Sequence, residues 1–356
     1  MQRLDGLQAL RGFAAAYVVL FHLVPIMELG ASLAWLKTFA SGGMAGVHLF
    51  FVLSGFVMWH TTHDKAGTAA AGRFVLKRFA RIYLSYWPWL LITSFLFLLM
   101  APQVLAGRHF FNETTLFPGG RPFLISVAWT LTYELYFYAL FAGLVLVGRH
   151  ARLLLLGLGL AGVLVFNVAI QPKAFAYDFG GFFLSPLIAE FLAGSLLAAA
   201  FRAGAFGLAS WLSAVGGVAI IGVGIWIGIT AGVISSPPLQ QVASLGLASC
   251  GIVMVVVALE HRISWPRWTV LLGDQSYSLY LGHPVLLSVA TLSGWFAFAH
   301  GRDILILIAG GALLLLMLAI TLLYYRALEL PLYRWACDLI DTCSGGERAR
   351  HIQNGS

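Results

Sequence analysis

Apolar stretches long enough to cross a bilayer alternate with short polar segments along nearly the whole chain. A membrane-spanning helix needs about 20 mostly apolar residues, and ten stretches approach that length. The predicted spans are Leu7–Met27, Met44–Thr61, Tyr83–Ala101, Phe123–Val147, Leu153–Ile170, Phe179–Ala200, Trp211–Ala231, Leu239–Leu259, Ser276–Trp295 and Ile304–Tyr324. The pattern therefore predicts an all-α, polytopic integral membrane bundle of about ten transmembrane helices, with residues 1–336 forming one membrane domain.

Composition and charge agree with a membrane protein. Only 10% of the 356 residues are charged, against about 25% in soluble domains. The net charge of +7 does not indicate a nucleic-acid partner, because the basic residues follow the predicted topology. With ten spans, 16 of the 21 Lys and Arg residues fall on the side of the N-terminus. This asymmetry predicts that both termini are cytoplasmic, and the polar, Gly-containing segment 337–356 is expected to be a disordered tail.

Cysteine usage gives no sign of a disulfide or a metal centre. Cys250 lies within a predicted span, while Cys337 and Cys343 fall in the C-terminal segment. None belongs to a Cys-x-x-Cys pair, so we expect neither a structural disulfide nor a zinc site.

Arg11 and His22 are the most informative polar residues, because both lie inside the first apolar stretch. Eleven residues at about 100° each return to within roughly 20° of the starting direction, so the two side chains share one helix face. Ionisable groups inside a membrane span are energetically costly and typically functional. A neutral imidazole can act as a general base near neutral pH, and the alternative is an interhelical hydrogen bond.

Glu134 is a second candidate, since it is a carboxylate near the middle of the fourth predicted span. Thr130, Glu134 and Tyr138 share a helix face. Glu134 either takes part in catalysis or pairs with Arg or Tyr to fix the bundle. Its predicted depth matches that of His22, so we expect the two side chains to approach each other across the site.

The basic cluster at the inner end of the third span contains Arg78 and Arg81, three residues apart and adjacent on a helix surface. Two Arg side chains there can hold phosphate groups, although basic residues at this position also anchor topology. Ser54 belongs to a Ser-Gly pair that interrupts an apolar helix, a pattern typical of a packing notch.

The order and spacing of several motifs together resemble the membrane acyltransferase-3 family, whose members O-acylate cell-surface glycans, lipopolysaccharide, Nod factors and some antibiotics. The motifs are Leu4–Gly12 with the Arg11 to His22 spacing, Phe50–Phe56, Arg78–Ile82, Trp129–Tyr138, Glu190–Gly194, Gly273–Tyr280 with His283-Pro284, and Tyr325–Pro331. The chain departs from the family at His48, where members often have Asp, and at Leu84, where Pro is common.

The resemblance implies an acyl-CoA donor, usually acetyl-CoA, bound from the cytoplasm, with no permanently bound cofactor. It implies that His22 is the essential catalytic histidine, that Arg11 is its required companion, and that Arg78 and Arg81 bind the donor. We expect Arg11 to hold the donor phosphates together with Arg78 and Arg81. Glu134 would orient the site or balance its charge. Substrate contacts within the motifs are assigned to Ser54, Trp129, Tyr133, His283 and Glu329. The expected acceptor is a carbohydrate or glycolipid hydroxyl, and the expected location, in contact with membrane lipid, is the bacterial inner membrane.

Two other interpretations are weighed against acyl transfer. A proton-coupled secondary transporter also carries intramembrane His, Arg and Glu, but transporters usually show internal repeats, and this sequence shows none. A soluble-type glycerolipid acyltransferase would need four residues between its His and Asp, whereas His60 and Asp64 have three between them. The sequence leaves open whether transfer is direct or passes through an acyl-histidine.

Overall fold

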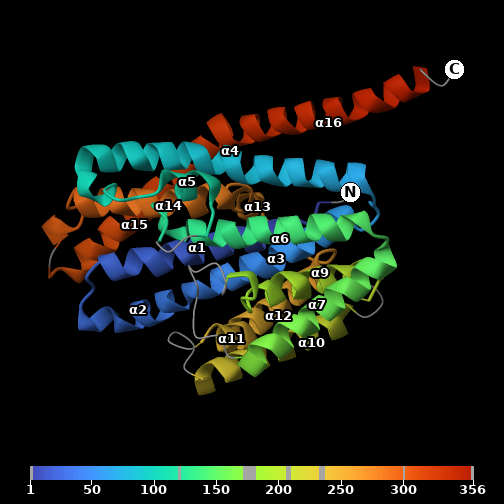
Figure 1. Ribbon diagram of the computed structural model, residues 1–356. Helices are drawn as coiled ribbons and strands as arrows, with labels where there is room; N and C mark the ends of the chain where they lie inside the picture. Colours follow the sequence, from blue (N-terminus) through green and yellow to red (C-terminus); the bar gives the residue numbers. More distant parts are fainter. Residues whose placement is uncertain are drawn as a thin grey trace.

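The computed structural model describes residues 3–118, 122–170, 182–205, 210–231, 237–299 and 301–353, and this part of the chain is helical without any strand. The long helices lie side by side in one bundle (Figure 1). Their bounds are α1 Asp5–Ile26, α3 Ala45–Thr62, α4 Thr68–Met100, α6 Trp129–Leu146, α7 Arg149–Ile170, α9 Ile188–Arg202, α10 Ser210–Ala231, α12 Leu247–Leu259, α14 Ser276–Leu292, α15 Asp303–Tyr324 and α16 Leu330–Gln353. Short helices connect them: α2 Ala34–Ser41, α5 Phe110–Thr115, α11 Pro238–Gln241 and α13 Arg267–Asp274.

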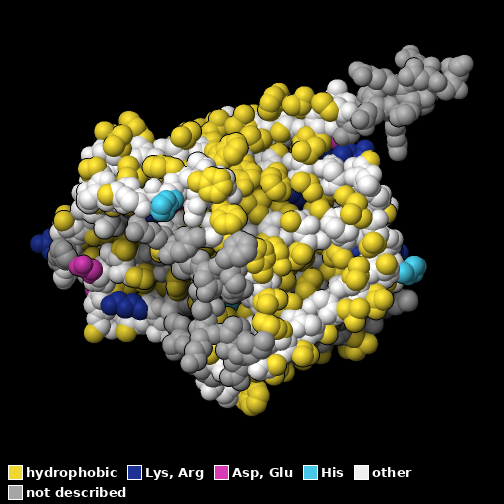
Figure 2. Space-filling model, in the orientation of Figure 1, with side chains coloured by type: hydrophobic (Ala, Val, Ile, Leu, Met, Phe, Trp, Pro, Cys, Tyr) yellow, Lys and Arg dark blue, Asp and Glu magenta, His cyan; other side chains and the backbone are white. Residues whose placement is uncertain are grey.

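Seven helical segments in the described residues are long and apolar enough to cross a membrane. They are Asp5–Ile26, Ala31–Thr62, Thr68–Met100, Arg149–Ala169, Trp211–Thr230, Pro238–Leu259 and Asp303–Cys343. Figure 2 shows hydrophobic side chains covering the middle of one face, with most charged side chains near its two ends. The chain is therefore an integral membrane protein with a helical bundle.

The three remaining predicted spans correspond to helices that are shorter than expected. Helices α6, α9 and α14 have 18, 15 and 17 residues, which gives lengths of about 22–27 Å against a hydrocarbon thickness of about 30 Å. The break at Gln275 separates α14 from α13. The total of ten spans thus stays a prediction, although each predicted span has a helix in the bundle.

Both ends of the chain lie at the same end of the bundle (Figure 1). Helix α1 begins there, where the carboxylate of Glu260 accepts hydrogen bonds from the backbone N–H of Gly6. Helix α16 also leaves the bundle toward this end and takes in residues 337–353, for which the sequence predicts a disordered tail. The division into membrane domain and tail stays a prediction, as does the cytoplasmic side of this end.

We expect an impermeant maleimide to label Cys343 only after cells are permeabilised, because the distribution of basic residues predicts cytoplasmic termini. Cys343 is exposed, whereas Cys250 and Cys337 are partly buried. Gel-shift labelling of intact and permeabilised cells measures this, and a Cys343→Ser variant identifies the labelled band. Labelling in intact cells would contradict the proposed orientation.

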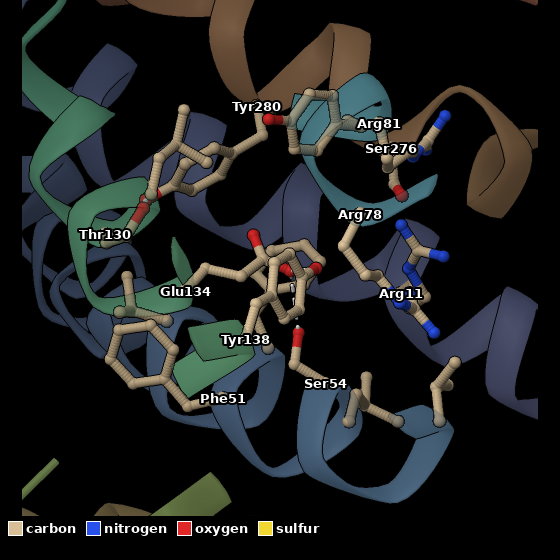
Figure 3. Close-up of a pocket in the computed structure, with 16 residues that line it drawn as sticks. Arg11, Phe51, Ser54, Arg78, Arg81, Thr130, Glu134, Tyr138, Ser276 and Tyr280 are labelled. Atoms are coloured by element: carbon tan, nitrogen blue, oxygen red, sulfur yellow. Dashed lines mark hydrogen bonds between the residues drawn. The ribbon is translucent and has the colours of Figure 1, made fainter. Parts of the chain in front are cut away.

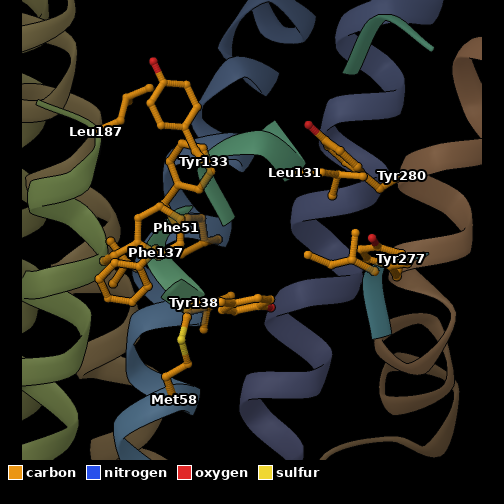
Figure 4. Packing of buried hydrophobic residues seen from close by; sticks show 14 of the residues in the cluster. Phe51, Met58, Leu131, Tyr133, Phe137, Tyr138, Leu187, Tyr277 and Tyr280 are labelled. Carbon is orange, nitrogen blue, oxygen red and sulfur yellow. The ribbon is translucent and has the colours of Figure 1, made fainter. Parts of the chain in front are cut away.

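Helices α3 and α9 pack closely against each other in the bundle. A β-carbon on Gly55 of α3 would collide with the backbone carbonyl of Phe191, and one on Gly194 of α9 would collide with that of Val52. The sequence expectation of a packing notch is confirmed at Gly55. Phe51, Phe137 and Phe191 stack in the buried core beside this contact, and Figure 4 shows Phe51 and Phe137 there.

The segment between α4 and α6, described over residues 102–118 and 122–128, returns into the bundle. Its helix α5 lies against the middle of α4, where Tyr83, Tyr86 and Trp87 donate hydrogen bonds to the carbonyls of Thr115, Glu113 and Thr114. A backbone at membrane depth needs such partners, because lipid supplies none. The loop is therefore a re-entrant segment tied to α4.

Helices α15 and α16 form one continuous helix through a π-helical turn, η8 Tyr325–Glu329. Glu329, the last residue of this turn, is fully buried. Its carboxylate accepts hydrogen bonds from Arg81 of α4 and from Ser278 of α14. The π turn therefore brings one acidic side chain to the junction of three helices, where the candidate site lies.

Candidate active site

A partly open pocket with an internal volume of about 100 Å³ lies between α1, α3, α4, α6 and α14. It is lined by Arg11, Val47, Phe50, Phe51, Leu53, Ser54, Val57, Arg78, Arg81, Thr130, Leu131, Glu134, Tyr138, Ser276, Tyr277 and Tyr280. The charged side chains in this lining are three arginines and one glutamate, so the pocket is suited to an anionic ligand. Figure 3 shows the arginines on one side and Glu134 with Ser54 and Tyr138 at the centre.

Arg11 has no direct partner among the described residues. It makes no hydrogen bond or ion pair with them, although it lies within electrostatic reach of Arg81 and Glu134. Its place on α1 is about 9 Å from the helix start at Asp5. A guanidinium at this depth is costly unless it meets an anion, which is what a ligand in the pocket can supply.

Arg78 and Arg81, which the sequence pairs in one role, have different surroundings. Arg81 forms an ion pair with Glu329 at 2.7 Å. Arg78 has no carboxylate partner in the described chain; it donates a 3.3 Å hydrogen bond to Thr61 and lies over the rings of Phe74 and Tyr138. The free positive charge of the pocket therefore comes mainly from Arg11 and Arg78.

Glu134 belongs to a hydrogen-bonded group at the centre of the pocket. The hydroxyls of Ser54, at 3.1 Å, and of Tyr138 both donate to its Oε1 atom. The pairing with Tyr138 follows from their i, i+4 spacing on α6. Ser54 thus has a polar role in the pocket while its neighbour Gly55 fills the packing role.

His22 lies outside the pocket lining, nearer the far end of α1. It is four residues from the helix end at Ile26 and partly exposed. Its Nδ1 atom lies 3.0 Å from the carbonyl of Val18 and 3.3 Å from Nε2 of His283. No direct hydrogen bond joins His22 to Glu134 within the described residues, so the expected approach of these two side chains stays a prediction.

Helix α14 connects the pocket to His22. Ser276, Tyr277 and Tyr280 line the pocket, and His283 follows three residues after Tyr280 on the same face. The Tyr280 ring packs against Phe50 and His283, with centroid distances of 5.5 and 5.9 Å, and its hydroxyl lies 3.0 Å from Thr130 Oγ1. A single helix face therefore leads from the arginines toward His22.

The remaining predicted site residues surround the pocket rather than line it. Trp129 and Tyr133 pack edge-on and tilted against Phe51, which does line it. His283 is fully buried and contacts His22, and Glu329 does not line the pocket but forms an ion pair with Arg81, which does. Each of these assignments to substrate binding stays a prediction.

His48, where the family often has Asp, lies behind the pocket wall. Its Nδ1 atom contacts Glu190 Oε1 of α9 at 2.6 Å, and both side chains are buried. The pair links the two helices that also meet at Gly55 and Gly194. The departure from the family is thus matched by an acidic partner for the histidine.

Comparison with known proteins identifies the family. The family model described as "Acyltransferase domain" matches residues 4–326. The chain belongs to this acyltransferase family. The chain is also 31% identical over 266 residues to "Exopolysaccharide production protein ExoZ" of Rhizobium meliloti (strain 1021), covering 71% of this chain and 79% of that protein. No solved structure matches the chain at a significant level.

Acyltransferase membership confirms the resemblance found in the sequence, and it favours acyl transfer over the transporter alternative. Five polar residues of the pocket lining were not assigned to the site from sequence: Thr130, Tyr138, Ser276, Tyr277 and Tyr280. The three on α14 belong to the Gly273–Tyr280 motif, whose polar and aromatic positions repeat at helical spacing. That repeat was the signal that could have identified them in this acyltransferase.

Proposed function

We propose that this protein transfers an acyl group, most simply acetyl, from cytoplasmic acyl-CoA to a hydroxyl of a carbohydrate-containing acceptor. The observation that carries the proposal is the pocket lined by Arg11, Arg78 and Glu134, in which neither arginine has a carboxylate ion-pair partner among the described residues. Guanidinium groups bind phosphates through two parallel hydrogen bonds, and the nucleotide end of CoA is rich in phosphate. The bacterial inner membrane, with its lipid around the bundle, is the proposed location.

In this proposal the donor phosphates and the catalytic base lie at different depths in the membrane. Arg11 and His22 are eleven residues apart on α1, a rise of about 16 Å. The extended pantetheine arm of a donor held by Arg11 and Arg78 would run along the face of α14 toward His22. The thioester would then lie near the imidazole, where an acceptor from the far side of the membrane can meet it.

His22 is the proposed general base. Its imidazole takes the proton of the acceptor hydroxyl while the hydroxyl oxygen bonds to the acyl carbon. The carbon–sulfur bond breaks, and the departing CoA thiolate takes the proton back from the imidazolium. A two-step route in which the imidazole carries the acyl group transiently uses the same residue.

The acceptor is proposed to be a surface polysaccharide or its lipid-linked precursor. The similarity to a protein of exopolysaccharide production supports this choice. The test is incubation of membranes carrying the protein with radiolabelled acetyl-CoA and polysaccharide from cells that lack the gene. We expect label in the polysaccharide together with release of free CoA. Uptake of solute without CoA release would instead favour a transporter.

Arg78→Ala is expected to weaken binding of acetyl-CoA about tenfold, because one charge-assisted phosphate contact is lost. The effect should shrink as salt rises, because the lost contact is electrostatic and is screened by ions. The measurement is the KM for acetyl-CoA at two ionic strengths in the membrane assay. Arg73→Ala, which removes a basic residue of α4 outside the pocket lining, is the matched control. An unchanged KM in Arg78→Ala would return this residue to a topological role.

A further inference from the structure

The two histidines at the far end of the candidate site are in direct contact, although they come from helices far apart in sequence. His22 is on α1 and His283 on α14. Their nearest nitrogens lie 3.3 Å apart, and their ring centroids 5.0 Å. We propose that His283 is a positioning residue, which holds the His22 imidazole in the tautomer and orientation needed to take a proton from the acceptor. This inference rests on the proposed function, in which His22 is the base.

The hydrogen bonds of His283 assign its tautomer. Its Nδ1 atom lies 3.1 Å from the backbone carbonyl of Leu279, one turn earlier on α14. A carbonyl only accepts, so Nδ1 carries the hydrogen of the neutral ring. The Nε2 atom of His283 then has a free lone pair, and this is the atom that faces His22.

The tautomer of His22 follows from that of His283. The Nδ1 atom of His22 faces two acceptors, the Val18 carbonyl at 3.0 Å and Nε2 of His283 at 3.3 Å. This nitrogen therefore carries the hydrogen, and the lone pair of His22 is on Nε2. Within the described residues, Nε2 of His22 makes no hydrogen bond, so it is available to a substrate hydroxyl.

Exposure decides which of the two rings is the base. His283 is fully buried and surrounded by α14 neighbours and the core, whereas His22 is partly exposed. Only His22 can therefore touch an acceptor. His283 acts through His22, as the buried acid does in a hydrolase triad, where it fixes the imidazole and steadies the imidazolium.

A neutral partner suits a site at membrane depth. A buried carboxylate next to His22 would need its own neutralising partners, whereas an imidazole lone pair accepts the same hydrogen bond without charge. When Nε2 of His22 takes the acceptor proton, the positive charge spreads to Nδ1. The hydrogen bonds to Val18 and His283 then strengthen, because the donor has become charged.

The test compares side chains at position 283 that keep or lose the atom that accepts a hydrogen bond from Nδ1 of His22. His283→Gln can place an amide oxygen near the former Nε2 atom, whereas His283→Asn and His283→Leu cannot. We expect kcat for transfer of radiolabelled acetyl from acetyl-CoA to fall 10- to 100-fold in Asn and Leu, the range typical of residues that orient a reactive group. His283→Gln should recover much of this loss. The KM for acetyl-CoA should stay within twofold, because His283 does not line the pocket.

The matched control is His60→Asn, which places the same amide at another buried histidine. His60 stacks on Phe56 and is tilted against Phe201, outside the pocket lining. The kcat of this variant should stay at the wild-type level. Melting temperatures in detergent identify any variant that fails to fold. If one of the two variants His283→Asn and His283→Leu fails to fold, the other serves for comparison with His283→Gln.

Two results overturn the inference. One is a wild-type kcat in His283→Asn or His283→Leu while His22→Ala is inactive, which leaves the proposed function intact. The other is an equal kcat loss in the Gln, Asn and Leu variants, which indicates a packing role. An active His22→Ala variant is a separate outcome: it rejects His22 as the base, and this inference with it, while acyl transfer from acetyl-CoA still stands.

Discussion

His22→Ala is expected to reduce acyl transfer about 10²- to 10⁴-fold while the protein still folds and inserts. This is the contribution that a positioned general base makes to a proton transfer. Stability should fall only modestly, because His22 is partly exposed and alanine favours the helix. The main cost is the unpaired Nε2 atom of His283, about 1–3 kcal/mol for one buried polar group. The measurement is transfer of radiolabelled acetyl in membranes with matched protein amounts.

Phe13→Ala is the control for this prediction, since it truncates a large, exposed side chain on the same helix. Its transfer rate should stay near that of the wild type. A His22→Ala variant with near-normal acylation of the acceptor would remove His22 from catalysis. Loss of the variant from the membrane would instead point to a structural role in the α1–α14 contact.

Arg81→Ala is expected to destabilise the protein by about 3–5 kcal/mol, the usual cost of removing one partner from a buried ion pair. Glu329 is fully buried, so the truncation leaves its carboxylate without the cation that neutralises it. Arg78→Ala should be far milder, because Arg78 has no carboxylate partner in the described part of the chain and donates one 3.3 Å hydrogen bond. Thermal unfolding in detergent, followed by size-exclusion chromatography, measures both.

The double variant Arg81→Ala/Glu329→Gln makes this prediction sharper. Neutralising Glu329 removes the unpaired charge, so the double variant should be more stable than Arg81→Ala alone. A loss of stability in the double variant equal to the sum of the losses in Arg81→Ala and Glu329→Gln would show that the ion pair does not carry the effect. A change in acetyl-CoA binding by Arg81→Ala can be interpreted only once the loss of stability of this variant is known. Arg78→Ala, which should be more stable, reports on acetyl-CoA binding directly.

Helical periodicity was sufficient to predict most of the bundle and the shared face of Arg11 and His22. The fifth predicted span, one of the two shortest, is present as α7 Arg149–Ile170. Periodicity also indicated the contact of Tyr138 with Glu134, because both are on one helix. These features depend on local geometry, which a sequence pattern describes well.

Contacts between helices were not predictable in the same way. The rotation of each helix decides that Ser54 faces the pocket, and that Trp129 and Tyr133 do not line it. The return of the loop with α5 depends on hydrogen bonds from α4 side chains to loop carbonyls, which leave no periodic pattern. The pairing of Arg81 with Glu329 joins residues 248 positions apart.

The π turn η8 gives this long helix one place that can absorb a change in chain length. A π turn holds one more residue than the α-helix around it, so deleting one residue within Tyr325–Glu329 would restore a regular helix. Residues after the turn would then keep their present faces, with Tyr333 beside Arg81 and Asp341 beside Lys77. A deletion elsewhere in the helix would instead rotate every later residue by about 100° and move it about 1.5 Å along the axis. Natural variation in the length of this helix should therefore be concentrated at the π turn.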